Sequence, residues 1–229
     1  MPRQLTFDLP SRPALGRDDF FVSPANTLAV AMIDGWESWP ERKLALVGAA
    51  GSGKTHLAHV WAAESSGSVL SAKGLCGQDI AGLAAGGARV AVEDVHQIAG
   101  EIAEEQALFH LHNLLLAEGG ALLLTSTTPP NRWSLSLPDL ASRMQGTNVA
   151  HLTLPDDELL KAVLMKLFAD RQLAVALPVV DYLVTRMERS FGGAQNMVKR
   201  LDQAALVQRR PITRAMVAAI LDIGTERPA

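Results

Sequence analysis

The stretch Gly48-Ala49-Ala50-Gly51-Ser52-Gly53-Lys54-Thr55 indicates the fold of this chain more strongly than any other segment. It matches the pattern G-x-x-x-x-G-K-[ST], a glycine-rich turn that joins a strand to a helix. Both neighbours fit, because residues 43–48 form a short apolar run and residues 54–64 are helix-forming. Strand, turn and helix together predict a phosphate-binding loop.

Each part of this loop has a chemical role. The glycines let the backbone wrap around a β-phosphate, so that N–H groups and the helix N-terminus point at it. Lys54 is expected to contact the β- and γ-phosphates, and the Thr55 hydroxyl to coordinate Mg²⁺. We therefore predict that residues 48–55 bind ATP or ADP together with Mg²⁺.

The composition of the 229 residues narrows the class of protein. Hydrophobic residues make up 48% and charged residues 20%, as expected of a folded chain. The net charge of −3 argues against a protein that mainly binds nucleic-acid phosphates, so we expect no direct sequence-specific DNA binding. The single cysteine, Cys76, excludes an internal disulfide. Neither a membrane helix nor a signal peptide is evident, so we expect a cytoplasmic protein.

Strand and helix patterns alternate after the loop and then give way to helices alone. The alternation predicts an α/β fold with a parallel sheet flanked by helices. Pro155 marks the change, and Pro178 and Pro211 are expected to break the helices that follow. The predicted domains are a tail and linker (1–13), an α/β nucleotide-binding domain (14–154) and a helical domain (155–229). The predicted strands are 43–48, 69–71, 89–94, 121–126 and 149–154, and the later helices are 156–171, 179–190, 193–209 and 214–222.

Three further positions are candidates for catalysis. Glu93 and Asp94 end an apolar strand, where a nucleotidase needs one acid near Mg²⁺ and another to polarise water. Such a pair is often only a solvated turn, but the preceding loop favours catalysis. Thr127 belongs to a run of hydroxyl residues after another strand, where it would sense the γ-phosphate or simply cap the loop.

Two segments are ambiguous from their residues alone. Arg143 lies on a predicted short helix, and a solvated surface arginine is its simplest interpretation. The alternative is an arginine that projects into a neighbouring subunit. The tail carries Gln4, Leu5, Phe7 and Leu9 ahead of a proline-containing linker. Its three apolar side chains, Leu5, Phe7 and Leu9, form an edge strand or pack on the body unless they bind a partner.

The motifs occur in an order that resembles the AAA+ initiator family of DnaA, and within it the small Hda-type regulators. Phe21-Val22-Ser23-Pro24-Ala25-Asn26 resembles the family's segment beside the adenine, and the loop continues into Thr55-His56-Leu57. Glu93-Asp94, Leu124-Thr125-Ser126-Thr127 and Asp139-Leu140-Ala141-Ser142-Arg143 stand at the places of the Walker B acids, sensor 1 and the arginine finger. The resemblance thus implies that Phe21, Val22 and His56 contact nucleotide and that Arg143 acts in trans.

The resemblance extends to both ends of the chain. The tail is similar to the peptide by which Hda-type proteins bind the DNA polymerase sliding clamp, which assigns Gln4, Leu5, Phe7 and Leu9 to that contact. The C-terminal helices would be an AAA+ lid. No helix-turn-helix domain of the kind that reads DNA in a full-length initiator is expected after them.

Two positions depart from the family pattern. The first Walker B acid is usually Asp, and Glu93 is one methylene longer. The lid arginine called sensor 2 is replaced by Gly192 or Gly193, with Arg189 the nearest alternative. Both departures predict at most a weak ATPase.

The resemblance implies a regulator that docks on the clamp, stimulates hydrolysis of DnaA-bound ATP and so represses replication initiation. A helicase-loader-like AAA+ ATPase and a small-molecule P-loop kinase are the alternatives. The bound nucleotide, the affinity for DnaA and the formation of a homo-oligomer stay open.

Overall fold

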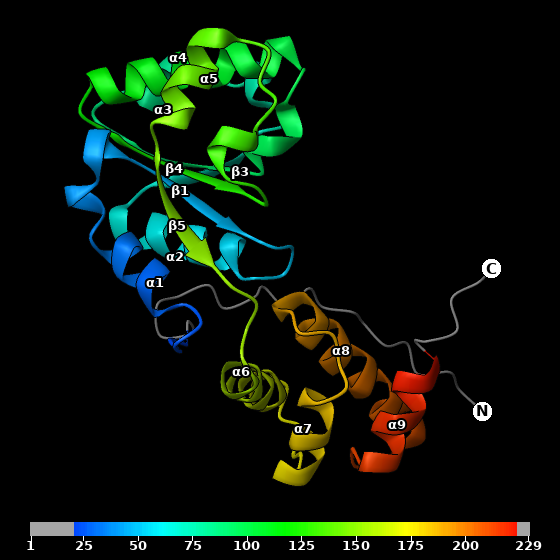
Figure 1. The fold of residues 1–229 in the computed structure, drawn as a ribbon. Coiled ribbons are helices and arrows are strands. Elements are labelled where there is room, and N and C mark those ends of the chain that lie inside the picture. The colour runs from blue at the N-terminus through cyan, green and yellow to red at the C-terminus, as the bar shows by residue number, and fades with distance from the viewer. Residues whose placement is uncertain (1–20, 224–229) are drawn as a thin grey trace.

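The computed structural model describes residues 21–223 as a sheet layered between helices, followed by a group of helices alone (Figure 1). All five strands are parallel and lie in the order β2-β3-β4-β1-β5. This confirms the predicted parallel sheet. The strands are β1 (Lys43–Gly48), β2 (Ser68–Ser71), β3 (Arg89–Glu93), β4 (Ala121–Ser126) and β5 (Asn148–Leu152).

The central strands bring the predicted motifs to one edge of the sheet. β1 and β4 are buried along their whole length, because helices cover both faces of a parallel sheet. Val47 on β1 is in register with Ser126 on β4, and Val92 on β3 is in register with Leu124. Since parallel strands end at the same edge, the segments that follow β1, β3 and β4 emerge side by side.

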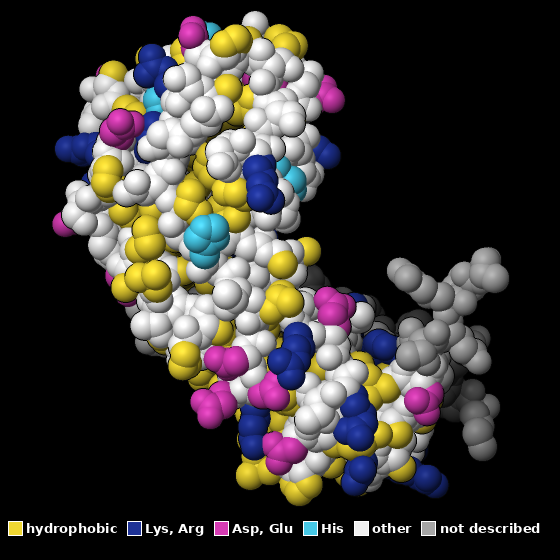
Figure 2. Space-filling model, in the orientation of Figure 1, with side chains coloured by type: hydrophobic (Ala, Val, Ile, Leu, Met, Phe, Trp, Pro, Cys, Tyr) yellow, Lys and Arg dark blue, Asp and Glu magenta, His cyan; other side chains and the backbone are white. Residues whose placement is uncertain are grey.

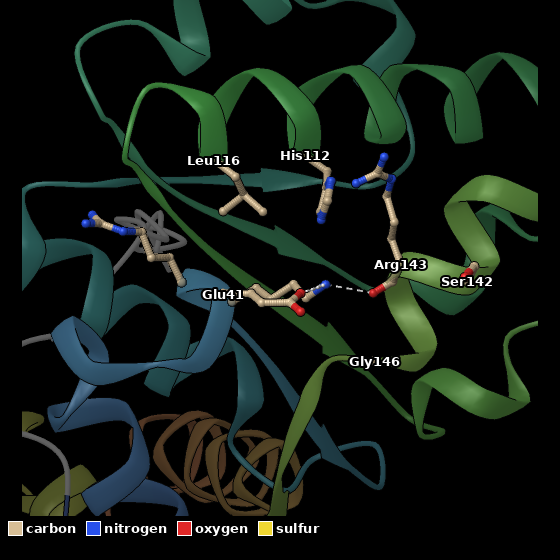
Figure 3. Close-up of a pocket in the computed structure, with 8 residues that line it drawn as sticks. Glu41, His112, Leu116, Ser142, Arg143 and Gly146 are labelled. Atoms are coloured by element: carbon tan, nitrogen blue, oxygen red, sulfur yellow. Dashed lines mark hydrogen bonds and ion pairs between the residues drawn. The ribbon is translucent and has the colours of Figure 1, made fainter.

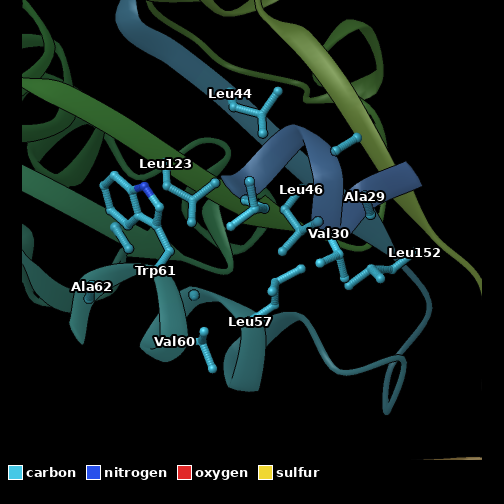
Figure 4. Close-up of a cluster of buried hydrophobic side chains, with 14 of the residues drawn as sticks. Ala29, Val30, Leu44, Leu46, Leu57, Val60, Trp61, Ala62, Leu123 and Leu152 are labelled. Carbon is cyan, nitrogen blue, oxygen red and sulfur yellow. The ribbon is translucent and has the colours of Figure 1, made fainter. Parts of the chain in front are cut away.

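One face of the sheet is covered by α1 (Thr27–Asp34) and α2 (Lys54–Ser65). Trp61 of α2 is fully buried there beside Leu123 and Leu46 (Figure 4). Its indole stacks on Trp39 with ring centroids 5.5 Å apart. The tryptophans of this face are therefore packing residues.

The other face is covered by α3 (Ile80–Ala84), α4 (Ile102–Ala117) and α5 (Pro138–Gln145). Glu105 of α4 is fully buried, and its carboxylate accepts the backbone N–H groups of Gly100, Ser136 and Leu137 at 2.8–3.0 Å. Three N–H donors satisfy a charge that would otherwise be costly to bury. The contact fixes the start of α5, the helix that carries Arg143, against α4.

The last four helices pack around a core of their own, which includes Phe168, Leu183 and Leu201. Asp156 caps the first of them, since its carboxylate accepts the Leu159 N–H at 2.7 Å. Side chains of both charges are interspersed over this part of the surface (Figure 2). The helices are α6 (Asp157–Asp170), α7 (Leu177–Val184), α8 (Phe191–Gln208) and α9 (Arg214–Ile223).

Two helix boundaries differ from the prediction. α7 spans Leu177–Val184 rather than 179–190. Pro178 does not break this helix, because it lies in the first turn, where the backbone N–H that proline lacks would have no partner within the helix. α8 begins at Phe191 rather than at 193, because the Ser190 hydroxyl accepts the Gly193 N–H at 2.8 Å and caps it.

Five short 3₁₀ turns complete the part of the chain that the structure describes, and within that part no helix is both long and apolar enough to span a membrane. The turns are Trp36–Ser38, Pro40–Arg42, Leu75–Gly77, Val95–Ile98 and Pro130–Arg132.

Candidate functional site

The loop between β1 and α2 adopts a backbone that only glycine tolerates well. Gly51 has φ of +74° and Gly53 has φ of +97°, both in the left-handed region. α2 starts immediately afterwards at Lys54, so its free N–H groups face into the loop. This is the strand, turn and helix that the sequence predicted.

Lys54 lies inside the loop with only 7% of its surface exposed. Its Nζ donates to the carbonyl oxygens of Gly48 at 2.8 Å and Ala49 at 2.9 Å. Burial lowers the pKa of Lys54, while the charges of Asp94 and Glu93 act to raise it. The acids that end β3 are thus within electrostatic reach of the lysine.

The ends of β3 and β4 are tied together next to this lysine. Asp94 takes a left-handed conformation with φ of +57°, and its N–H donates to the Thr125 hydroxyl at 3.1 Å. Glu93 Oε1 and Ser52 Oγ are buried and have no hydrogen-bond partner in the described residues. Buried polar atoms of this kind normally have a partner, and a carboxylate oxygen suits Mg²⁺. The site therefore fits a phosphate ligand with a metal ion.

A cavity of about 1130 Å³ separates this loop from the helical part. Asp94 and Thr127 line it, and Phe21 lines the side near the start of the described chain. The loop contributes Ala50, Gly51, Gly53, Lys54, Thr55 and His56, whereas Gly48, Ala49, Ser52, Glu93 and Val22 are not on its wall. The structure thus brings most of the predicted nucleotide-site residues together.

Two helices of the helical part form the opposite wall. The sequence predicted these helices but did not indicate that most of the side chains on this wall line the cavity. Their wall residues recur at intervals of three and four, which puts them on one face of each helix. That spacing was visible in the sequence. Residues that pack in a core show the same spacing, so it does not by itself indicate a cavity wall. The missed residues are Val163, Lys166, Leu167 and Asp170 on α6, Gln195, Asn196 and Lys199 on α8, and His59, His96, Gln97, Arg171 and Phe191; Gly192 on α8, which the sequence had singled out, lies on the same wall.

The helical part touches the loop directly. The Phe191 N–H donates to the Gly51 carbonyl at 3.0 Å. A Cβ on Gly51 would lie 2.4 Å from the Cβ of Ser190, and one on Gly53 would lie 2.9 Å from the Phe191 ring. The two glycines are therefore required for the approach of α8 as well as for the shape of the loop.

The structure distinguishes the three candidates for the lid position. Gly192 lines the cavity, and a Cβ there would meet nothing within 4 Å. A Cβ on Gly193 would lie 2.9 Å from the Glu188 carbonyl oxygen. Arg189 pairs with Asp157 at 2.8 Å, within the helical part. Gly192 is thus the position from which a longer side chain would reach the cavity.

Arg143 is exposed on α5 and does not line this cavity. Its guanidinium lies over the Phe109 ring of α4, 5.4 Å from the centroid, and borders a second, smaller cavity with His112 and Glu41 (Figure 3). The predicted catalytic residues therefore do not form one site. Arg143 is exposed and lies outside the larger cavity of its own chain.

Two sets of predicted site residues, those for the clamp and those for the metal ion, stay predictions. Gln4, Leu5, Phe7 and Leu9 lie outside the described residues. Within the described range, no group of three or more His, Cys, Asp or Glu side chains forms a metal site by itself. A metal ion would need oxygen ligands from a bound phosphate as well.

Comparison with known structures defines the class of the fold. Domain III of the replication initiation protein DnaA from Thermotoga maritima superposes with a TM-score of 0.78 at 19% identity, covering 96% of this chain and 100% of that one. AMPPCP-bound DnaA from Aquifex aeolicus gives a TM-score of 0.68 at 18% identity over 86% of this chain and 70% of that chain. A variant of Thermotoga maritima RuvB gives 0.61 at 20% identity over 86% and 65% of the two chains. The chain thus has the P-loop AAA+ fold.

The helical part gives a more particular match. Residues 156–221 match the family model of the Hda lid domain. The C-terminal helices are thus similar to the Hda lid domain, and the chain as a whole has the fold of DnaA domain III, as the resemblance predicted.

Proposed function

We propose that this chain is a nucleotide-binding regulator of replication initiation, which docks on the sliding clamp and stimulates hydrolysis of DnaA-bound ATP. The observation that carries the proposal is the position of Arg143, exposed and away from the chain's own nucleotide cavity. The Hda-type lid and the DnaA-like fold support it. Its direct test is whether the clamp-bound protein accelerates hydrolysis of labelled ATP carried by DnaA.

The larger cavity would hold ADP or ATP with Mg²⁺. Lys54 would exchange the carbonyl oxygens of Gly48 and Ala49 for phosphate oxygens, and the N–H groups of residues 48–55 would complete the cradle. Thr55 and Glu93 would hold the metal, which would neutralise phosphate charge. Asp94 and Thr127 line the cavity and would orient a water near the phosphates.

The chain's own hydrolysis is expected to be slow. Glu93 is longer than the aspartate usual in the family, and Gly192 places no cation at the sensor 2 position of the lid. Without that cation, charge on a transferring phosphoryl group has one less stabilising partner. The protein would therefore hold nucleotide as a structural ligand rather than consume it.

Replacing Gly192 with Arg is expected to raise the chain's own ATP turnover by about tenfold or more, because one well-placed donor is worth roughly 10²–10³ in rate. The new side chain has open space at its Cβ and faces the cavity. Single-turnover hydrolysis of labelled ATP without any partner measures the effect.

The matched control is Gly192→Ala, which adds a Cβ but no charge. Both variants remove a helical glycine and should keep or slightly raise the melting temperature. Equal turnover in the Arg and Ala variants would show that the missing cation does not limit hydrolysis.

Replacing Gln4, Leu5 and Phe7 together with Ala is expected to remove clamp binding with little change in thermal stability. Side chains that anchor an extended tail contribute to an interface and little to the core. Surface plasmon resonance on immobilised clamp measures the first effect, and a melting curve measures the second. Ser11→Ala with Arg12→Ala in the linker serves as the control, and a marked loss of melting temperature in the triple variant would mean that the tail packs on the body instead.

A further inference from the structure

The cavity beside Arg143 lies on the other side of the α/β domain from the loop residues and belongs to neither the loop nor the lid. It measures about 510 Å³ and is formed where the start of β1 meets α4 and α5 (Figure 3). Its wall consists of Glu41, Arg42, Lys43, His112, Leu116, Ser142, Arg143 and Gly146. The volume is sufficient for the end of an acidic side chain.

The charges on this wall are unbalanced. Lys43 and Arg143 share a single carboxylate, that of Glu41, whereas the Arg42 guanidinium donates to the Gly119 carbonyl instead, so the formal charge is +1 when the imidazole is neutral. The hydrogen bond and charge of Lys43 lower the pKa of Glu41, so its carboxylate is already ionised and adds no further compensation.

Lys43 is a buried cation with an unused donor. It is 3% exposed, and its Nζ donates to Glu41 Oε2 at 2.7 Å and to the Arg143 carbonyl at 2.8 Å. An ammonium group carries three N–H donors, so these two contacts leave one over. The backbone immediately before Lys43 is strained, because two residues other than glycine, Glu41 and Arg42, adopt a left-handed φ near +50°.

His112 supplies a second buried polar atom. The residue is 2% exposed, its Nδ1 lies 3.2 Å from Asn113 Oδ1, and its Nε2 has no partner in the described part of the chain. Burial lowers the pKa of His112, and the charges of Lys43 and Arg143 lower it further. An anion in the cavity would oppose both charges and favour a protonated ring whose Nε2–H donates to it.

A protein that meets Arg143 would cover this wall. Covering an uncompensated positive charge removes it from water, which is unfavourable unless the partner brings negative charge to the same place. On the basis of the proposed function, we infer that the cavity beside Arg143 is an oxyanion-binding site that receives an acidic side chain of the partner protein. The contact would hold the partner in register while Arg143 meets its nucleotide.

Gly146 allows a test that changes charge without changing bulk. It is exposed at the end of α5 with φ of −78°, and a Cβ there would meet only the Arg143 carbonyl, at 3.9 Å. Gly146→Glu would place a tethered carboxylate at the cavity, whereas Gly146→Gln has the same size and no charge.

The first measurement uses inorganic sulfate as a free oxyanion, with ADP saturating the P-loop. NMR of the His112 ring should show sulfate binding in the wild type and in Gly146→Gln, and its loss in Gly146→Glu. No binding in the wild type, or equal binding in all three proteins, would overturn the site. This measurement does not depend on DnaA, so it tests anion binding in the cavity even if the proposed function fails.

The second measurement is the affinity for the AAA+ domain of DnaA. Gly146→Glu should weaken it by at least about tenfold, whereas Gly146→Gln should change it by less than about threefold. Equal affinities of the Glu and Gln variants, with sulfate binding intact, would refute the acidic partner and leave a free anion as the ligand. Absence of stimulation by the wild type would instead refute the proposed function.

Discussion

Replacing Arg143 with Ala is expected to remove the stimulation of ATP hydrolysis on DnaA while leaving nucleotide binding, clamp binding and folding intact. An arginine supplied in trans meets charge that develops on the transferring phosphoryl group, so its contribution is made mainly in the transition state. The expected loss is about 10³-fold or more in rate. The assay contains clamp loaded on DNA, DnaA carrying labelled ATP, and the wild-type or variant protein.

A matched control exists in the lid. Arg186 is also exposed and also lies over an aromatic ring, 4.0 Å from the centroid of Tyr182. Arg186→Ala removes the same charge and the same kind of cation–π contact, which at an exposed site is worth about 0.5–1 kcal/mol. A similar stimulated rate for the Arg143 and Arg186 variants would refute the trans role, and the chain would then be better considered a nucleotide-dependent loader.

Replacing Lys54 with Ala is expected to abolish measurable ADP and ATP binding. The side chain lies inside the loop at 7% exposure, and the backbone N–H groups around it cannot supply the lost charge. Charge-assisted hydrogen bonds contribute about 1.5–3 kcal/mol each, so losing two of them weakens binding by roughly 100-fold or more. Isothermal titration calorimetry with ADP measures the change.

The Lys54 variant also needs a test of folding. It leaves the carbonyl oxygens of Gly48 and Ala49 without their lysine donor, which should cost about 1 kcal/mol and lower the melting temperature only modestly. Lys73→Ala, at an exposed position outside the cavity, is the control. Wild-type affinity in the Lys54 variant would mean that the loop does not bind the phosphates.

The parts of the fold that depend on local sequence were predictable. The loop conformation follows from Gly51 and Gly53 themselves, and the all-buried strands β1 and β4 follow from continuous apolar runs. α1 was not predicted, because it is short, apolar on most sides and begins without a side-chain cap. The domain limits and the roles of the site residues stay predictions.

The arrangement around the site depended on contacts between distant segments. Nothing near Arg143 in the sequence indicates that its carbonyl oxygen accepts the Lys43 ammonium, since the pair is 100 residues apart. The lid wall had the same helical spacing as a core, so its polar members such as Lys199 could not be assigned to a cavity. Only the tertiary packing of the lid distinguishes a helix face that lines a cavity from one that packs in a core.

The hydrogen bond from the Phe191 N–H to the Gly51 carbonyl has a kinetic consequence. It joins the two walls of the larger cavity at one edge, so any movement that separates α8 from the loop must break it. Separation also exposes the ring of Phe191, which packs where Gly53 has no side chain, to water. If nucleotide binds there as proposed, we expect these contacts to slow its release and to give a residence time longer than the phosphate contacts alone would give.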